Sequence, residues 1–173
     1  FFLIVTAFML VMLLMEIPTG AFSDKISRKW SLIIASLIGI PTMITIILSN
    51  TLIVVITAMA ISGVAGAFIS GTDSAMMYDT LKALKREKEF KKINGKLLWY
   101  NGWAGAIGGI FGGLLAQLQL SFAWWATFIA GIFILFIQIT LVEPPFYKES
   151  KHEESYLLHL GRSFRHSFTG NAS

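Results

Sequence analysis

Long uncharged stretches alternate with short charged ones along the first 142 residues of the chain. Five of these stretches contain about 20 mainly apolar residues each, the length that a helix needs to cross a membrane. They cover residues 1–22, 30–48, 52–81, 97–117 and 122–142. The third is long enough to extend beyond the hydrocarbon at one end. The pattern predicts an all-α integral membrane protein, a polytopic bundle of five transmembrane helices.

Composition supports a membrane protein. The chain is 55% hydrophobic and 14% charged, against about 45–50% and about 25% for soluble domains. It has no cysteine, which excludes disulfides and thiolate metal sites. Basic residues lie in short loops between spans, so nucleic-acid binding is not expected. No nucleotide-binding or hydrolase motif occurs, so neither catalysis nor a cofactor is predicted.

The distribution of lysine and arginine predicts the orientation of the spans. Residues 23–29 carry three basic side chains, and residues 82–96 carry seven. The intervening loops, residues 49–51 and 118–121, carry none. Because positive charge accumulates in cytoplasmic loops, we expect the basic loops to face the cytoplasm. We expect this multi-pass chain to lie in the cytoplasmic membrane of a bacterial cell.

The region 143–173 is polar and should form a cytoplasmic tail. Its aromatic and leucine side chains recur at helical spacing, which is typical of an amphipathic helix on a membrane surface; they are Tyr156, Leu157, Leu160, Phe164 and Phe168. A solvated linker remains the alternative. The three histidines of the tail recur every seven residues and belong to no metal-binding motif with cysteine or carboxylate ligands at the required spacing, so no metal site is predicted.

The stretch from residue 20 to residue 32 contains the most specific motif of the chain. It reads G-A-F-S-D-K-I-S-R-K-W-S-L and resembles the loop signature of the major facilitator superfamily, G-x-L-A-D-R-x-G-R-K-x-x-L. Gly20, Asp24, Arg28, Lys29 and Leu32 match this signature, whereas Ser27 replaces its second glycine. We expect Gly20 to permit close helix approach, and the loop joins two spans on the predicted cytoplasmic side.

The resemblance implies an arrangement and a function. The five spans would be helices two to six of a transporter half, with the first helix and the C-terminal half as missing partners. Such proteins move a small-molecule substrate by alternating access between halves. Resemblance to bacterial drug-efflux members further implies a proton-coupled antiporter that exports its substrate. A non-transporting membrane scaffold is the alternative function.

Charged residues at the cytoplasmic ends of the spans are candidates for a gate. Asp24 and Arg28 are four residues apart and can form an ion pair, and Asp79 at the inner end of the third span can reach Arg28. The gating candidates are therefore Gly20, Asp24, Arg28, Lys29 and Asp79. If Arg28 were lost, we expect Lys29 and Lys25 to substitute for it in part.

Polar groups within the spans are candidates for substrate or proton binding, because intramembrane ionisable residues usually face a cavity or a partner. At about 1.5 Å per residue, Glu16, Asp73 and Asn101 all lie in the cytoplasmic half of the membrane. The alternative is that the two carboxylates lie at the interface and are hydrated from inside.

The fourth span is rich in glycine and predicts close helix packing. Gly105, Gly109 and Gly113 recur every four residues, a pattern that lets helix backbones approach in membranes; Gly108 and Gly112 belong to the same set. The set also partly fits the antiporter signature of efflux transporters, although Gly109 stands where that signature has proline. Tryptophans near the span ends, including Trp99 and Trp103, are expected to anchor the helices at the membrane interface.

Overall fold

The computed structural model describes residues 2–144, and within this range every regular element is helical. The helices are α1 (Phe2–Lys25), α2 (Arg28–Leu48), α3 (Leu52–Ala83), the short 3-10 helix η1 (Glu87–Glu89), α4 (Phe90–Leu118) and α5 (Leu120–Thr140). The prediction of an all-α bundle is confirmed for this part of the chain. The predicted tail helix falls on residues 145–173, outside the described residues.

Four of the helices, α1 to α4, extend beyond the predicted spans at the ends next to the basic loops, whereas α5 ends at Thr140, two residues before the predicted end of its span. α1 continues to Lys25 and α2 begins at Arg28, so only residues 26 and 27 connect them. α4 begins at Phe90 rather than at residue 97. Hydropathy marks the segment that can lie in hydrocarbon, whereas a helix continues into the headgroup region where lysines are solvated. The sequence therefore located the spans better than the ends of the helices.

Four of the long helices are apolar and long enough to cross a membrane: α1, α2, α3 and α5. α4 has the required length, but it is the least apolar of the five long helices. Its six glycines after residue 100 contribute little hydrophobicity, and Asn101 and Gln117 reduce it further. That α4 also spans the membrane stays a prediction.

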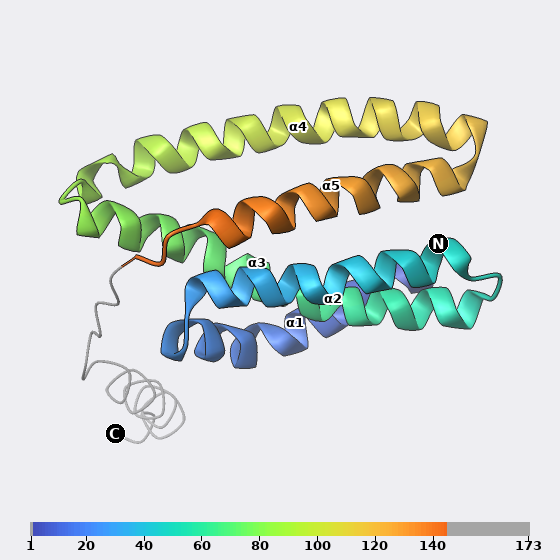
Figure 1. The fold of residues 1–173 in the computed structure, drawn as a ribbon, viewed down its shortest axis with the longest axis horizontal. Coiled ribbons are helices and arrows are strands. Elements are labelled where there is room, and N and C mark those ends of the chain that lie inside the picture. Colours follow the sequence, from blue (N-terminus) through green and yellow to red (C-terminus); the bar gives the residue numbers. More distant parts are fainter. Residues whose placement is uncertain (1, 145–173) are drawn as a thin grey trace, which may run out of the picture.

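The helices are arranged around α3, which packs most extensively against α1 and α2. α5 packs on α2, and α4 lies at the edge of the bundle, where it contacts mainly α5 (Figure 1). Helices that are neighbours in sequence are therefore not always neighbours in space. α1 and α2, although consecutive, meet only slightly, because α3 packs against both.

Close contact between α1 and α3 depends on two glycines of α3. A Cβ atom at Gly63 would lie 2.5 Å from the backbone oxygen of Phe8, and one at Gly66 would lie 3.1 Å from the Phe8 ring. Without Cβ atoms at these positions the two backbones approach closely, which strengthens van der Waals packing where lipid offers no hydrophobic driving force. Gly20, in contrast, has no such neighbour within 4 Å among residues 2–144, so the expectation that it permits close helix approach stays a prediction.

Hydrogen bonds between side chains also join the central helices. The hydroxyls of Thr42 in α2 and Ser62 in α3 are 2.8 Å apart and buried. Ser36 of α2 donates to the amide oxygen of Gln138 in α5 at 2.6 Å. Interhelical hydrogen bonds of this kind contribute about 0.6 kcal/mol on average in a membrane protein. They fix the register of α2 between α3 and α5.

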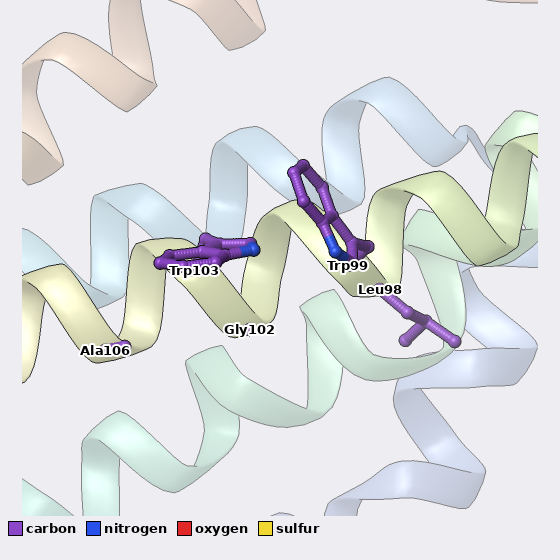
Figure 2. Close-up of a pocket in the computed structure, with 5 residues that line it drawn as sticks. All are labelled: Leu98, Trp99, Gly102, Trp103 and Ala106. Atoms are coloured by element: carbon purple, nitrogen blue, oxygen red, sulfur yellow. The ribbon is translucent and has the colours of Figure 1, made fainter.

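α4 differs from the other long helices because none of its residues is buried. The five glycines predicted to pack, at positions 105, 108, 109, 112 and 113, have no heavy atom within 4 Å of an added Cβ apart from the helix's own backbone and chain neighbours. Residues 2–144 thus supply no partner for this glycine face, and its packing stays a prediction. Figure 2 shows a hollow on the surface of the same helix, lined by Leu98, Trp99, Gly102, Trp103 and Ala106.

Candidate functional site

The connection between α1 and α2 is built around Ser27. Its backbone is extended, and its hydroxyl oxygen accepts a hydrogen bond from the Trp30 amide at 3.1 Å. Serine is among the preferred residues at this position because its side chain satisfies an amide that has no partner within the helix. Ser27 therefore ends the turn and starts α2, at the place where the family signature has its second glycine.

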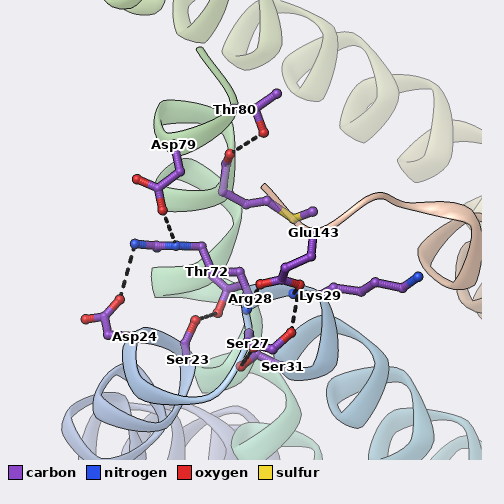
Figure 3. Close-up of polar contacts among 11 residues, drawn as sticks. Ser23, Asp24, Ser27, Arg28, Lys29, Ser31, Thr72, Asp79, Thr80 and Glu143 are labelled. Atoms are coloured by element: carbon purple, nitrogen blue, oxygen red, sulfur yellow. Dashed lines mark hydrogen bonds and ion pairs between the residues drawn. The ribbon is translucent and has the colours of Figure 1, made fainter. Parts of the chain in front are cut away.

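Glu143, which follows α5, binds the start of α2 (Figure 3). Its carboxylate accepts hydrogen bonds from the Ser27 hydroxyl at 2.7 Å, the Arg28 amide at 2.8 Å and the Lys29 amide at 2.9 Å. A negative charge at a helix N-terminus is also stabilised by the helix dipole. Glu143 is thus a second cap of α2, supplied from more than 100 residues away in the sequence.

Sequence reasoning missed Glu143 as a site residue and assigned it only to the tail. The available signal was weak: a single carboxylate directly after the last span, on the same predicted side of the membrane as the start of α2. Lys29 makes a further contact between the same two elements, because its Nζ donates to the Ile139 carbonyl at 2.7 Å. Lys29 is therefore engaged by α5, and the expectation that it substitutes for Arg28 is not supported.

Arg28 lies between two aspartates from different helices (Figure 3). Its Nε is 2.6 Å from Asp79 Oδ2 of α3, and its Nη2 is 3.4 Å from Asp24 Oδ1 of α1. The Arg28 side chain is 15% exposed, against 21% for Asp79 and 53% for Asp24. The structure thus brings together the three charged residues that the sequence predicted to meet, and Asp79 is the closer and less exposed partner.

One nitrogen of the Arg28 guanidinium, Nη1, is buried and has no hydrogen-bond partner among the described residues. Beside the cluster, the Thr72 hydroxyl donates to Ser23 Oγ at 2.9 Å, and both side chains are almost fully buried. This bond fixes the C-terminal end of α1 against α3. The cluster therefore rests on a closely packed base, which orders the helices that carry its carboxylates.

The intramembrane candidates are less closely associated. The Ser70 hydroxyl of α3 donates to Glu16 Oε1 of α1 at 3.2 Å. Asp73 is exposed, and within residues 2–144 it forms no recorded hydrogen bond or ion pair; Asn101 is exposed on α4. The structure places Glu16 beside α3, but no contact among the described residues joins Glu16, Asp73 and Asn101. Their role in binding stays a prediction.

The contacts of Arg28 and Glu143 depend on the relative positions of the helices that carry their partners. Among residues 2–144, no group of three or more histidine, aspartate or glutamate side chains could hold a metal ion. The cluster instead connects the ends of α1, α2, α3 and α5 through one arginine and one glutamate. Such a connection can favour one arrangement of the helices over another.

Apolar helices of membrane-spanning length and intramembrane carboxylates define this chain as a multi-pass membrane protein. A sequence profile described as Major Facilitator Superfamily matches residues 2–169. The chain therefore belongs to the major facilitator superfamily of transporters. Neither the curated proteins nor the solved structures contain a significant match to it.

Proposed function

We propose that the chain is part of a secondary active transporter that moves a small molecule by alternating access, and that Asp24, Arg28 and Asp79 form its cytoplasmic gate. The observation that carries the gate is the placement of Arg28. Its side chain contacts carboxylates on α1 and α3, while its backbone amide is bound by Glu143 after α5. Movement of any of these helix ends would change the interactions of the same arginine.

The strength of the ion pairs suits a gate better than a structural brace. Partly exposed ion pairs contribute about 0.2–1 kcal/mol each, and 1.4 kcal/mol changes a two-state ratio about tenfold. Two such pairs can therefore shift the balance between conformations appreciably. They remain weak beside the helix packing and buried hydrogen bonds that maintain the fold.

The proposed direction of transport is export, and the proposed coupling ion is the proton. Export coupled to protons is supported by the resemblance to efflux transporters and by two carboxylates, Glu16 and Asp73, that this chain leaves exposed. Glu16→Gln and Asp73→Asn should each abolish proton-driven transport while substrate exchange without a gradient continues. Proton-driven transport at the normal rate in both variants would remove these residues from the coupling mechanism.

The orientation in the membrane is proposed from the basic loops. Because the chain has no cysteine, single cysteines can report it directly. A cysteine at Asn50 should react with an impermeant reagent applied outside intact cells, and one at Lys92 should not. Reaction at Lys92 from outside would reverse the proposed orientation.

The gate is tested by substitutions in the full-length transporter. Asp24→Asn should reduce transport by up to about fivefold, the effect of losing one partly exposed pair, and leave the melting temperature close to wild type, because Asp24 is 53% exposed and is not needed for packing. Arg28→Ala should reduce transport at least as much, since Lys29 Nζ is already bound to the Ile139 carbonyl. Glu87→Gln, an equal change of charge at an exposed position on the same side, is the control. Normal transport by Asp24→Asn would remove the gate from the mechanism.

A further inference from the structure

One face of α4 carries basic residues followed by tryptophans. Taking about 100° per residue in a helix, Lys96, Trp99 and Trp103 lie within about 40° of Lys92 around the helix axis. All four side chains are exposed, with Trp99 at 60% and Trp103 at 56%. Lys92, Lys96, Trp99 and Trp103 are named here the Lys–Trp face. The face runs from the basic loop into the apolar part of α4.

The Lys–Trp face points away from the remainder of the bundle. The half-buried residues Phe90, Leu97 and Leu115 of α4 lie about 140–160° around the helix from Lys92. Phe90 also packs edge-to-face against Tyr78 of α3, with ring centroids 5.5 Å apart. The side of α4 that meets α3 and α5 is therefore opposite to the lysines and tryptophans. Nothing within residues 2–144 covers them.

The hollow seen in Figure 2 lies at the tryptophans of this face. It has a volume of about 350 Å³ and is lined by Leu98, Trp99, Gly102, Trp103 and Ala106. Gly102 has no side chain and Ala106 has only a methyl group, which leaves room beside the two indole rings. The centroids of these rings are 5.9 Å apart. The lining is apolar, and its only polar side-chain atoms are the indole nitrogens. It suits a hydrocarbon chain better than a polar ligand.

The charge at the basic end is not neutralised by neighbouring acids. Residues 82–96 contain seven lysine and arginine residues and two glutamates. One of these, Glu89, pairs with Arg86 at 2.6 Å, and this hydrogen bond holds the pKa of Glu89 below its ordinary value. The first turn of α4 contains no acidic residue. Glu89 also interacts electrostatically with Lys92, but seven basic residues against two acidic ones leave residues 82–96 with a net charge of +5 (7 − 2). This excess of positive charge can attract an anion to Lys92 and Lys96.

We propose that the Lys–Trp face binds an anionic phospholipid in the leaflet next to the basic loop. Lys92 and Lys96 contact the phosphate-bearing headgroup, Trp99 lies close to the level of the glycerol, and an acyl chain passes Trp103 in the hollow beside Gly102 and Ala106. The dimensions agree. From Lys96 to Ala106 the helix rises about 15 Å, which is half of a hydrocarbon core about 30 Å thick.

Lipid binding is measured by native mass spectrometry of the full-length transporter, delipidated in detergent and titrated with phosphatidylglycerol. Phosphatidylcholine with the same acyl chains serves as the uncharged comparison. Each basic residue near an anionic lipid surface strengthens binding about fivefold. Lys92→Gln with Lys96→Gln should therefore weaken phosphatidylglycerol binding about 25-fold and leave phosphatidylcholine binding unchanged.

The matched control is Lys85→Gln with Lys91→Gln, which removes the same charge from the same region. Lys91 lies about 100° around α4 from Lys92, so this pair should change binding about threefold or less. Trp103→Ala should weaken the binding of both lipids, whereas Trp125→Ala on α5 should weaken the binding of neither. Melting temperatures of all variants verify that the proteins are folded.

Two results would overturn the proposal. If the two double variants lose the same amount of phosphatidylglycerol binding, the lipid is attracted by the basic charge in general and does not bind at a site. Disulfide formation between Ala106→Cys and a cysteine in another segment of the transporter, in high yield, would show that protein and not lipid occupies the hollow. Selective loss in the Lys92 and Lys96 pair, with no such cross-link, is the supporting outcome.

Discussion

α3 and α4 are both long, glycine-rich helices, yet they use their glycines differently within this chain. Gly63 and Gly66 of α3 meet the backbone and ring of Phe8 in α1. Gly105, Gly109 and Gly113 of α4 have open space around them. α3 also carries eight buried residues, whereas α4 has none.

The difference shows what a glycine pattern specifies. Small residues at helical spacing allow another helix to approach closely, but they do not identify that helix. For α3 the partner is α1, and their contact is part of this chain. For α4, residues 2–144 provide no partner that packs against the exposed glycines or the Lys–Trp face.

The largest effect is expected where the backbones are closest. Gly63→Ala should lower the melting temperature of the full-length transporter, because its Cβ would lie 2.5 Å from the Phe8 backbone oxygen and neither backbone can move freely. Overpacking of this kind costs about 1–3 kcal/mol. Thermal unfolding in detergent measures the effect.

Gly109→Ala is the matched control, since its Cβ would meet nothing within residues 2–144 and alanine favours a helix. It should leave stability unchanged or raise it. If Gly109→Ala instead destabilises the transporter as strongly as Gly63→Ala, α4 packs closely against another segment and the comparison between the two helices fails.

A smaller effect is expected at Glu143, which joins the end of α5 to the start of α2. Glu143→Ala removes three hydrogen bonds to Ser27, Arg28 and Lys29. Loss of a helix cap costs about 0.5–2 kcal/mol, so we expect a decrease in stability within that range, measured by thermal unfolding. Glu87→Gln on the exposed η1 should have no effect. A wild-type melting temperature for Glu143→Ala would show that α5 is fixed to α2 by packing alone.

The smallest effect is expected where α3 ends. Lys85 has a φ of 57°, in the left-handed region that glycine adopts without steric cost. Its amide donates to the Lys82 carbonyl, and the Arg86 amide donates to the Leu81 carbonyl. These two hydrogen bonds cap the C-terminal end of α3. Lys85→Gly should stabilise the protein by about 0.5–1 kcal/mol, whereas Lys91→Gly in α4 should destabilise it. A loss of stability with Lys85→Gly would show that its side chain, rather than its backbone, matters there.

The sequence predicted the helical class, the positions of the spans and the meeting of Asp24, Arg28 and Asp79. These features depend on local hydropathy and on charges at the ends of neighbouring helices. It did not predict Glu143, because a cap supplied by a distant element leaves no local pattern. It also favoured the glycines of α4 over Gly63, because the regular spacing in α4 is conspicuous while the partner that decides close approach lies elsewhere in the chain.

The central claim is that the Arg28 cluster biases a conformational equilibrium, and Asp79→Asn tests it most directly. A single cysteine replacing Ser74, an exposed position in the C-terminal half of α3, reports opening on the proposed cytoplasmic side through its rate of labelling in inverted vesicles. Losing the 2.6 Å ion pair between Asp79 and Arg28 should raise that rate up to about fivefold, in line with the strength of a partly exposed pair. The melting temperature should remain close to wild type. An unchanged labelling rate, or a rate that rises only as the protein unfolds, would contradict the account.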